Sequence, residues 1–101
     1  MRKVLKKWGW YKVLTKGNGF KVKLLYLKPF GKTSLQRHKH RREIWIFLDS
    51  QEVKIAKRHR WHHLSNPSNK GLRLIEVQIG ICQERDIERQ KEIAGNKHYG
   101  Q

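Results

Sequence analysis

Apolar and polar residues alternate along several short stretches of the chain, most clearly over residues 20–27. Every second position from Phe20 to Tyr26 is aromatic or aliphatic, with Lys21 and Lys23 between them. A period of two is typical of a β-strand with one buried face, because successive side chains of a strand point to opposite sides. We therefore expect a strand here whose apolar side faces the core.

Turn signals between the alternating stretches predict further strands. The sequence GNG at 17–19 precedes the first stretch, so residues 10–27 are expected to form a β-hairpin. The sequences EIWIFL (43–48), EVKIAK (52–57) and LRLIEVQIGI (72–81) predict three more strands, with SNPSNKG as a turn-rich connector before the last. Five or six short strands indicate an all-β protein, either a small antiparallel barrel or a sandwich.

Two segments depart from this simple alternation. Within 72–81 the apolar residues change from even to odd positions near Ile75, which predicts a change of the buried face there. The sequence QERDIERQKEIAG at 83–95 places Glu84 and Glu88 on one face of a helix, and we expect a short C-terminal helix.

The composition bounds the size and the partners of the protein. With 101 residues, the chain is expected to form one domain, 1–101, around a single modest core. Its 24 Lys and Arg against 8 Asp and Glu give a formal charge of +16, which favours anionic partners, whether nucleic acid or phosphorylated small molecules. These cations are spread along the whole chain, so they define no binding track.

Cysteine use and hydropathy indicate the compartment. The single cysteine, Cys82, cannot form an internal disulfide, which suits a reducing environment. No apolar run approaches the length of a membrane span, and the basic N-terminus lacks the apolar core of a signal peptide. We expect a cytoplasmic protein with no membrane partner.

Candidate chemistry is concentrated in TSLQRHKHRREIW, residues 33–45. On an extended strand, His38 and His40 point to the same side, which is the spacing for two ligands of one metal ion, and Glu43 follows at the start of the next strand. The sequence RHRWHHL, residues 58–64, brings three more histidines from a distant part of the chain. Imidazole nitrogens and a carboxylate suit zinc, iron, manganese, cobalt or nickel.

The same residues also fit a second interpretation. Lys39, Arg41 and Arg42 surround the two histidines, so the segment could be a solvated cationic loop that contacts phosphate. Each neighbouring positive charge also disfavours a divalent cation. Spacing alone leaves both interpretations open.

Several stretches together resemble one protein family. They are WGWYKVL, GNGFKVK, the dipeptide KP, SLQRHKHRREIW and HLSNPSNKGLRLIEVQIG, in this order over nearly the whole chain. The chain is thus similar to the cupin domain of type II phosphomannose isomerases. That domain stands at the C-terminus of bifunctional mannose-1-phosphate guanylyltransferase/mannose-6-phosphate isomerases.

This resemblance implies a cupin barrel, a double-stranded β-helix of the jelly-roll type, with a metal centre inside it. The ligands it implies are His38, His40 and Glu43 from the first motif and, by its place before LSNP, His62 from the second. The implied cofactor is a divalent cation, zinc in the first place, with iron, manganese, cobalt or nickel as alternatives. The implied reaction is the interconversion of mannose 6-phosphate and fructose 6-phosphate.

The chain departs from that family between the two motifs. The stretch from Glu43 to His62 is shorter than in a full barrel by about fifteen residues, roughly one β-hairpin. A barrel that lacks about one hairpin has open edge strands, and natural proteins cover, charge or pair such edges. We therefore expect a homodimer.

An aldose–ketose isomerase needs a Lewis acid at the two oxygens and a base nearby. The catalytic candidates are His63 as the base and Glu43 in the metal centre, with metal-bound hydroxide as the alternative base. The substrate, a phosphorylated sugar or another anionic small molecule, requires cations for its phosphate. The candidates for this role are Lys21, Lys23, Arg41 and Arg89.

Two other functions stay open at this point. Cupins that resemble one another perform different reactions or only bind ligands, so the fold does not choose the chemistry. A basic nucleic-acid-binding protein would use the +16 charge together with Trp8, Trp10 and Trp61 for stacking. No Gly-rich phosphate loop is present, so we expect no guanylyltransferase activity from this sequence.

Overall fold

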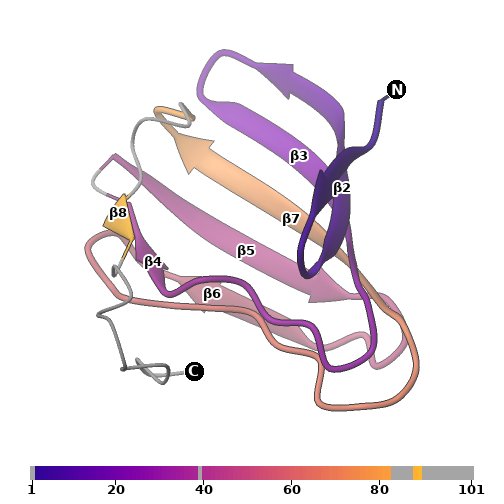
Figure 1. Ribbon diagram of the computed structural model, residues 1–101. Coiled ribbons are helices and arrows are strands. Elements are labelled where there is room, and N and C mark those ends of the chain that lie inside the picture. The colour runs from indigo at the N-terminus through magenta and orange to yellow at the C-terminus, as the bar shows by residue number, and fades with distance from the viewer. Residues whose placement is uncertain (1, 39, 83–87, 90–101) are drawn as a thin grey trace.

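The computed structural model describes residues 2–38, 40–82 and 88–89, and within these ranges the chain forms strands and connections but no α-helix (Figure 1). The strands are β1 Val4–Lys6, β2 Gly9–Gly17, β3 Phe20–Leu27, β4 Gln36–Arg37, β5 Arg41–Phe47, β6 Val53–Ala56, β7 Leu72–Gly80 and β8 Glu88–Arg89. The predicted all-β class, the hairpin over 10–27 and the three later strands are confirmed. In the part of the chain that the structure describes, no helix is long and apolar enough to cross a membrane.

The predicted C-terminal helix lies almost wholly outside the described residues. Of residues 83–95, the structure describes Glu88 and Arg89, and these form the two-residue strand β8, which pairs with β4.

One antiparallel sheet forms the body of the molecule. Its strand order is β1-β2-β3-β7-β5-β6, and β4 and β8 form a second small sheet. The long connections that follow β3 and β6 cross in front of the large sheet and pair with each other (Figure 1). Lys32 pairs with Ser65, and Gln36 pairs with His62. These paired connections form the second wall of a barrel-like interior.

The prediction that the side of β3 carrying Phe20 is buried is wrong. Phe20 is 40% exposed, whereas Lys23 is 6% exposed and Leu25 and Leu27 are buried beside it. The buried face is therefore the one that carries the lysines, because the interior is polar at one end. The alternation located the strand correctly, but hydrophobicity chose the wrong face.

The change of face predicted near Ile75 is also wrong. Strand β7 keeps one face inward, since Leu74, Glu76 and Gln78 are all buried while Ile79 is 43% exposed. Its register with β3 and β5 runs without interruption through this stretch. Glu76 and Gln78 belong to the interior, so the apolar residues between them face outward.

The outer face of the sheet is consequently apolar. Across β3, β7, β5 and β6 the register places two rows of outward-facing side chains side by side. One row contains Val22, Val77, Ile44 and Ile55, and the other contains Leu24, Ile75, Ile46 and Val53. On the edge strand β6, Val53 is 56% and Ile55 is 62% exposed. We call these two rows the outer apolar face.

The inner face has an apolar end that forms the core. Leu25, Leu74 and Phe47 lie opposite one another on β3, β7 and β5 and are buried together with Leu27 and Leu64. Each such side chain contributes about 1.5–3 kcal/mol by leaving water. This cluster joins the sheet to the connection after β6, which carries Leu64.

A buried asparagine fixes the same connection. The side-chain amide of Asn66 donates hydrogen bonds to the carbonyl oxygens of Leu27, Lys28 and Lys70, at 3.2, 3.1 and 2.7 Å. Its own oxygen accepts from the backbone N–H and the hydroxyl of Ser68. Asn66 thereby ties the turn-rich segment to the end of β3 and holds the chain just beyond His62 in place.

Candidate metal centre

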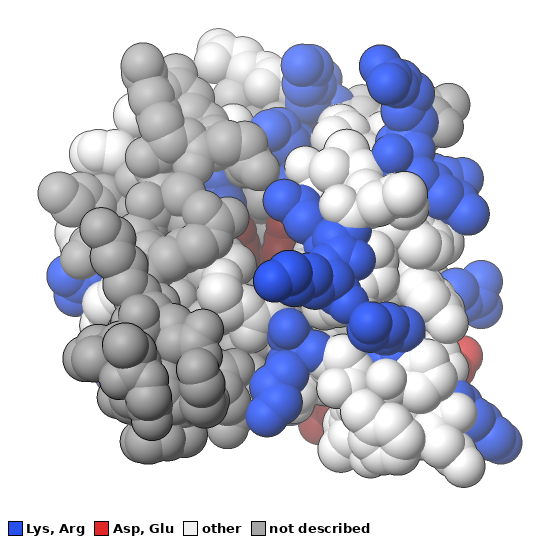
Figure 2. All heavy atoms as spheres, in the orientation of Figure 1, with Lys and Arg blue, Asp and Glu red and all other residues white. Residues whose placement is uncertain are grey.

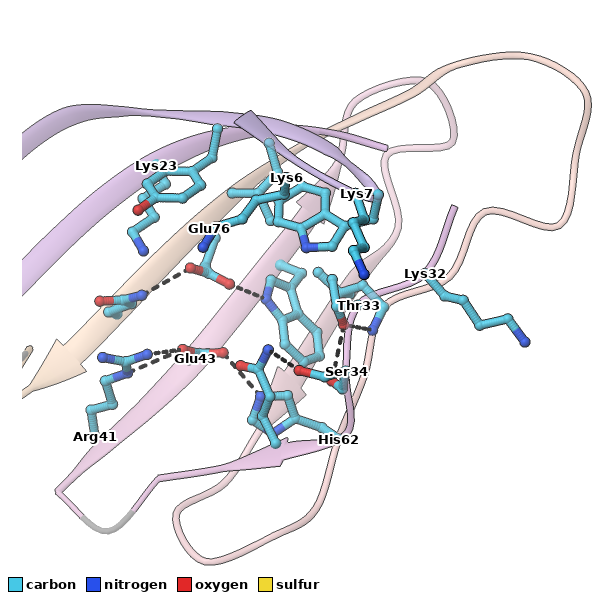
Figure 3. A pocket seen from close by; sticks show the side chains of 17 residues that line it. Lys6, Lys7, Lys23, Lys32, Thr33, Ser34, Arg41, Glu43, His62 and Glu76 are labelled. Atoms are coloured by element: carbon cyan, nitrogen blue, oxygen red, sulfur yellow. Dashed lines mark hydrogen bonds and ion pairs between the residues drawn. The ribbon is translucent and has the colours of Figure 1, made fainter. Parts of the chain in front are cut away.

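A cavity of about 470 Å³ lies between the inner face of the sheet and the paired connections. Figure 2 shows acidic atoms deep in a hollow, with Lys and Arg side chains gathered along one side of it. The close view in Figure 3 shows Glu43 and Glu76 facing each other from neighbouring strands inside the cavity, with His62 below them. Because both carboxylates face this space, any chemistry of the cavity is centred on them.

Two histidines converge on the carboxylate of Glu43. The Nε2 atom of His38 lies 3.2 Å from Oε2, and the Nε2 atom of His62 lies 3.2 Å from Oε1. The two imidazole rings are 5.1 Å apart between centroids, and the potential ligand atoms of all three residues lie within 4.8 Å of one another. His38 and Glu43 are buried, and the side chain of His62 is 12% exposed.

Three different elements position this group. Glu43 stands on the inward face of β5, directly opposite Gln78 of β7. His38 follows β4, and His62 stands on the connection after β6. The backbone of Gln36 holds that connection, because its N–H and C=O exchange hydrogen bonds of 2.8 Å with those of His62. The ring of His62 also packs on Trp45, with centroids 5.1 Å apart.

The donor set fits a divalent cation. Two imidazole nitrogens and a carboxylate are ligands that zinc and other first-row transition metals accept. Both Nε2 atoms point toward Glu43, so His38, Glu43 and His62 could hold one ion between them. The arrangement brings together residues from both histidine-containing stretches of the sequence.

A buried cation competes for the same carboxylate. The Nε and Nη2 atoms of Arg41 donate to Oε2 of Glu43 at 3.1 and 3.0 Å, and Nη2 lies 3.4 Å from Nε2 of His38. Burial alone would raise the pKa of Glu43, but the hydrogen bond from His62 and the charges of His38, Arg41 and His62 lower it overall. The carboxylate is therefore kept ionised and able to bind a cation.

The structure does not place His40 with the other proposed ligands. His40 is exposed, and the chain bends there, so the period of two that would align it with His38 does not hold. Gln36 has the inward position instead, since it lines the cavity two residues before the buried His38. The period of two expected of an extended chain therefore holds between Gln36 and His38, but it does not hold between His38 and His40.

The remaining sequence candidates divide into two groups. Lys23 and Arg41 line the cavity, whereas Lys21 and His63 do not, and the side chain of Arg89 lies outside the described residues. Partial burial, together with the charges of Lys32 and His62, lowers the pKa of His63. The proposed base therefore stands apart from the cavity that would hold a substrate.

Sequence reasoning missed a second carboxylate in the cavity, Glu76. Its oxygens accept hydrogen bonds of 2.9 Å from the indole N–H of Trp45 and from the amide of Gln78. Burial, followed by the nearby Glu43 charge, raises the pKa of Glu76. The signal in the sequence was the period of two of the polar residues Glu76 and Gln78 within a stretch, residues 74–79, that is otherwise apolar.

Comparison with known sequences agrees with the resemblance found above. A family model described as mannose-6-phosphate isomerase C-terminal matches residues 1–60. The xanthan biosynthesis protein XanB of Xanthomonas campestris is 36% identical over 110 residues, which cover 93% of this chain and 24% of that protein. The mannose-1-phosphate guanylyltransferase RfbM of Salmonella typhimurium is 32% identical, over 93% of this chain and 23% of its own. The chain thus spans about a quarter of the length of these curated relatives.

Solved structures support the fold. The cupin domain of Schizosaccharomyces pombe Cnp3 aligns with a TM-score of 0.70 at 14% identity, over 76% of this chain and 68% of that domain. The capsular polysaccharide assembling protein CapF of Staphylococcus aureus aligns with a TM-score of 0.79 at 12% identity, over 89% of this chain and 34% of CapF. At these identities the likeness concerns the fold alone, and it confirms the predicted cupin-type architecture.

Proposed function

Because the chain belongs to the family of mannose-6-phosphate isomerase C-terminal domains, we propose that its cavity is a metal-assisted site for a phosphorylated sugar. The proposed reaction is the interconversion of mannose 6-phosphate and fructose 6-phosphate. One observation carries this proposal: His38, Glu43 and His62 converge on one another, and Glu43 and His62 line a cavity of about 470 Å³. Membership of this family supports a role in sugar-phosphate metabolism, and both that role and the reaction are our proposal.

The roles of the residues follow from their chemistry. A bound divalent cation would polarise the oxygens of a sugar carbonyl and its neighbouring hydroxyl. His38, Glu43 and His62 would hold it, and this leaves Glu43 unsuited to carry protons. Glu76 is the other carboxylate in the cavity, and burial, followed by the nearby Glu43 charge, raises its pKa, which makes it a stronger proton acceptor than an ordinary carboxylate. We therefore propose Glu76, rather than His63, as the base.

A comparison of two neighbouring histidines tests the metal centre. Wild-type protein and the variants His38→Ala and His40→Ala would be stripped with a chelator, reloaded with zinc, and analysed for bound metal and for isomerase activity. We expect His38→Ala to lose at least tenfold in zinc affinity and to lose activity, since a ligand is removed. His40→Ala should behave like the wild type, because its side chain is exposed. Equal losses in both variants would contradict this site.

We also propose that two copies of the chain associate through the edge strand β6. Val53 and Ile55 are more than half exposed on this strand, next to the rest of the outer apolar face. Pairing of two edge strands would satisfy the open backbone groups and bury these side chains. Light scattering should give the mass of a dimer for the wild type and of a monomer for Ile55→Lys. A wild-type monomer at micromolar concentration would refute this.

Nucleic-acid binding is the competing hypothesis, and of the three tryptophans expected to stack on bases Trp61 fits it best, because it is 40% exposed and has the guanidinium of Arg37 4.7 Å from its ring centroid. Trp45 is buried and Trp8 packs against the core, so neither is available for stacking on bases. Trp10 is stacked on Tyr26, with centroids 5.5 Å apart. Salt-dependent binding of DNA that survives both chelation and His38→Ala, with no bound metal, would favour this alternative.

A further inference from the structure

We propose that the wall of the cavity formed by Lys23, Glu76 and Gln78 binds the hydroxyl groups of a sugar, while Lys6 and Lys7 at its mouth bind the anionic group of the same ligand. We call Lys23, Glu76 and Gln78 the polar wall. The proposal deepens the proposed function and rests on it for the class of ligand, a phosphorylated hexose. It assigns the substrate to residues that are separate from the metal centre.

The first observation is an unpartnered acceptor. Gln78 is completely buried and lines the cavity, and its Nε2 donates to Glu76 at 2.9 Å, which fixes the orientation of the amide. Its Oε1 is buried and, among the described residues, has no hydrogen-bond partner. A buried acceptor without a donor costs about 1–3 kcal/mol. A ligand hydroxyl that donates to Oε1 would remove that cost.

The second observation is the position of the polar wall beside the metal centre. In the sheet register Gln78 lies directly opposite Glu43, and Glu76 lies directly opposite Lys23 on one side and Trp45 on the other. Side chains directly opposite in an antiparallel pair have Cβ atoms about 4.5–5.5 Å apart. One small ligand can therefore contact Gln78, Glu76 and the metal centre at the same time.

The third observation is the charge of the cavity. Its described lining contains five cationic side chains, Lys6, Lys7, Lys23, Lys32 and Arg41, but only the two carboxylates Glu43 and Glu76. Figure 3 shows Lys6 at the end of β1 and Lys7 in the turn that follows reaching toward the cavity, whereas Lys32 points away from it. Arg41 is engaged with Glu43. Lys6 and Lys7 are thus the lysines placed to receive a phosphate at the mouth.

Together these features fit a ligand with two unlike ends. Acceptors and a buried lysine at the polar wall match hydroxyl groups, which both donate and accept hydrogen bonds. Flexible exposed lysines at the mouth match a phosphate, which needs charge more than fixed geometry. A free sugar would use one half of the cavity, and inorganic phosphate the other half.

Calorimetry on the full chain, kept metal-free with a chelator, tests this assignment. The probes are mannose 6-phosphate, mannose and inorganic phosphate, and the variants are Gln78→Met, which keeps the approximate shape but removes both the Oε1 acceptor and the Nε2 donor to Glu76, and Lys6→Ala/Lys7→Ala. We expect Gln78→Met to weaken mannose 6-phosphate about tenfold, the value of one hydrogen bond, and to leave inorganic phosphate unchanged. The double lysine variant should weaken both. Lys57→Ala, an exposed lysine outside the cavity lining, serves as the control.

The outcomes separate this inference from the proposed function. If the metal-free chain fails to bind mannose 6-phosphate, or binds it equally well as Gln78→Met, the polar wall is not a sugar site, whatever the activity of the metal-loaded protein. If binding follows the expected pattern while the zinc-loaded chain converts no substrate, the inference stands and the proposed reaction falls. Thermal unfolding of each variant, followed by circular dichroism, verifies that the variant is folded.

Discussion

The two ends of the interior are built from the same three strands and have opposite chemistry. At one end Leu25, Leu74 and Phe47 lie opposite one another and form the core. Two residues along, the same register brings Lys23 and Glu76 together in the cavity. We call these the apolar end and the polar end. The comparison indicates that stability and function are divided along each strand rather than between separate elements.

The largest expected effect is at the apolar end. Leu74→Ala should lower the free energy of unfolding by about 2–5 kcal/mol, because it leaves a cavity at a completely buried position. Urea denaturation measures this loss. Ile79→Ala, on the outward face of the same strand, is the matched control and should cost much less, since Ile79 is 43% exposed. Similar losses in both variants would mean that the core has been placed on the wrong face.

A smaller effect on stability is expected at the buried Asn66, which holds the connection after β6 in place. Asn66→Ala leaves the carbonyl oxygens of Leu27, Lys28 and Lys70 without their donor and should cost about 1–3 kcal/mol. It should also weaken metal binding, because Asn66 anchors the connection that carries His62. Asn69→Ala, an exposed residue of the same connection, should change neither quantity. Unchanged metal affinity in Asn66→Ala would show that His62 is positioned independently of it.

The smallest effect is expected at the polar end, where Glu76→Gln should increase stability at neutral pH. Burial holds the pKa of Glu76 above its usual range. As pH rises past the ordinary carboxyl pKa, the unfolded chain releases a proton that the folded chain keeps, so Glu76 progressively destabilises the fold until its raised pKa is passed. At about pH 4 the carboxyl is mostly protonated in the unfolded chain as well, so this penalty is small.

Urea denaturation of Glu76→Gln and the wild type at about pH 4 and pH 7 tests this sign. The stability gained by the variant should be larger at pH 7. A larger gain at the acidic pH would show that Glu76 is ionised in the fold without penalty. The same variant should lose isomerase activity, since Glu76 is the proposed base.

How much of the fold could be predicted from the sequence depends on the same division between the apolar end and the polar end of the interior. Period-two alternation located β3 and β7 whichever face was buried, and the GNG turn fixed the hairpin of β2 and β3. Hydrophobicity then chose the wrong face, because the polar end of the interior places Lys23, Glu76 and Gln78 inward. A polar lining of the interior reverses the pattern on which such predictions depend.

The candidate site could be predicted from the sequence only in part. Resemblance to a family brought His38, Glu43 and His62 together from distant stretches, and the structure places them within reach of one another. The same resemblance, together with the assumption of an extended chain, also assigned His40, which is exposed at a bend of the chain. Glu76 carried no motif, and its position opposite Trp45 becomes visible only in the sheet register.

The pairing of Gln36 with His62 has a consequence for the order of folding. The hairpin of β2 and β3 is local, whereas Gln36 and His62 are distant in the sequence, so we expect the hairpin to form early and the pairing of the two connections to form later. His62 therefore reaches Glu43 late. During refolding in the presence of zinc, binding of the ion should lag behind the appearance of β-structure, and it should report on the pairing of the two crossing connections.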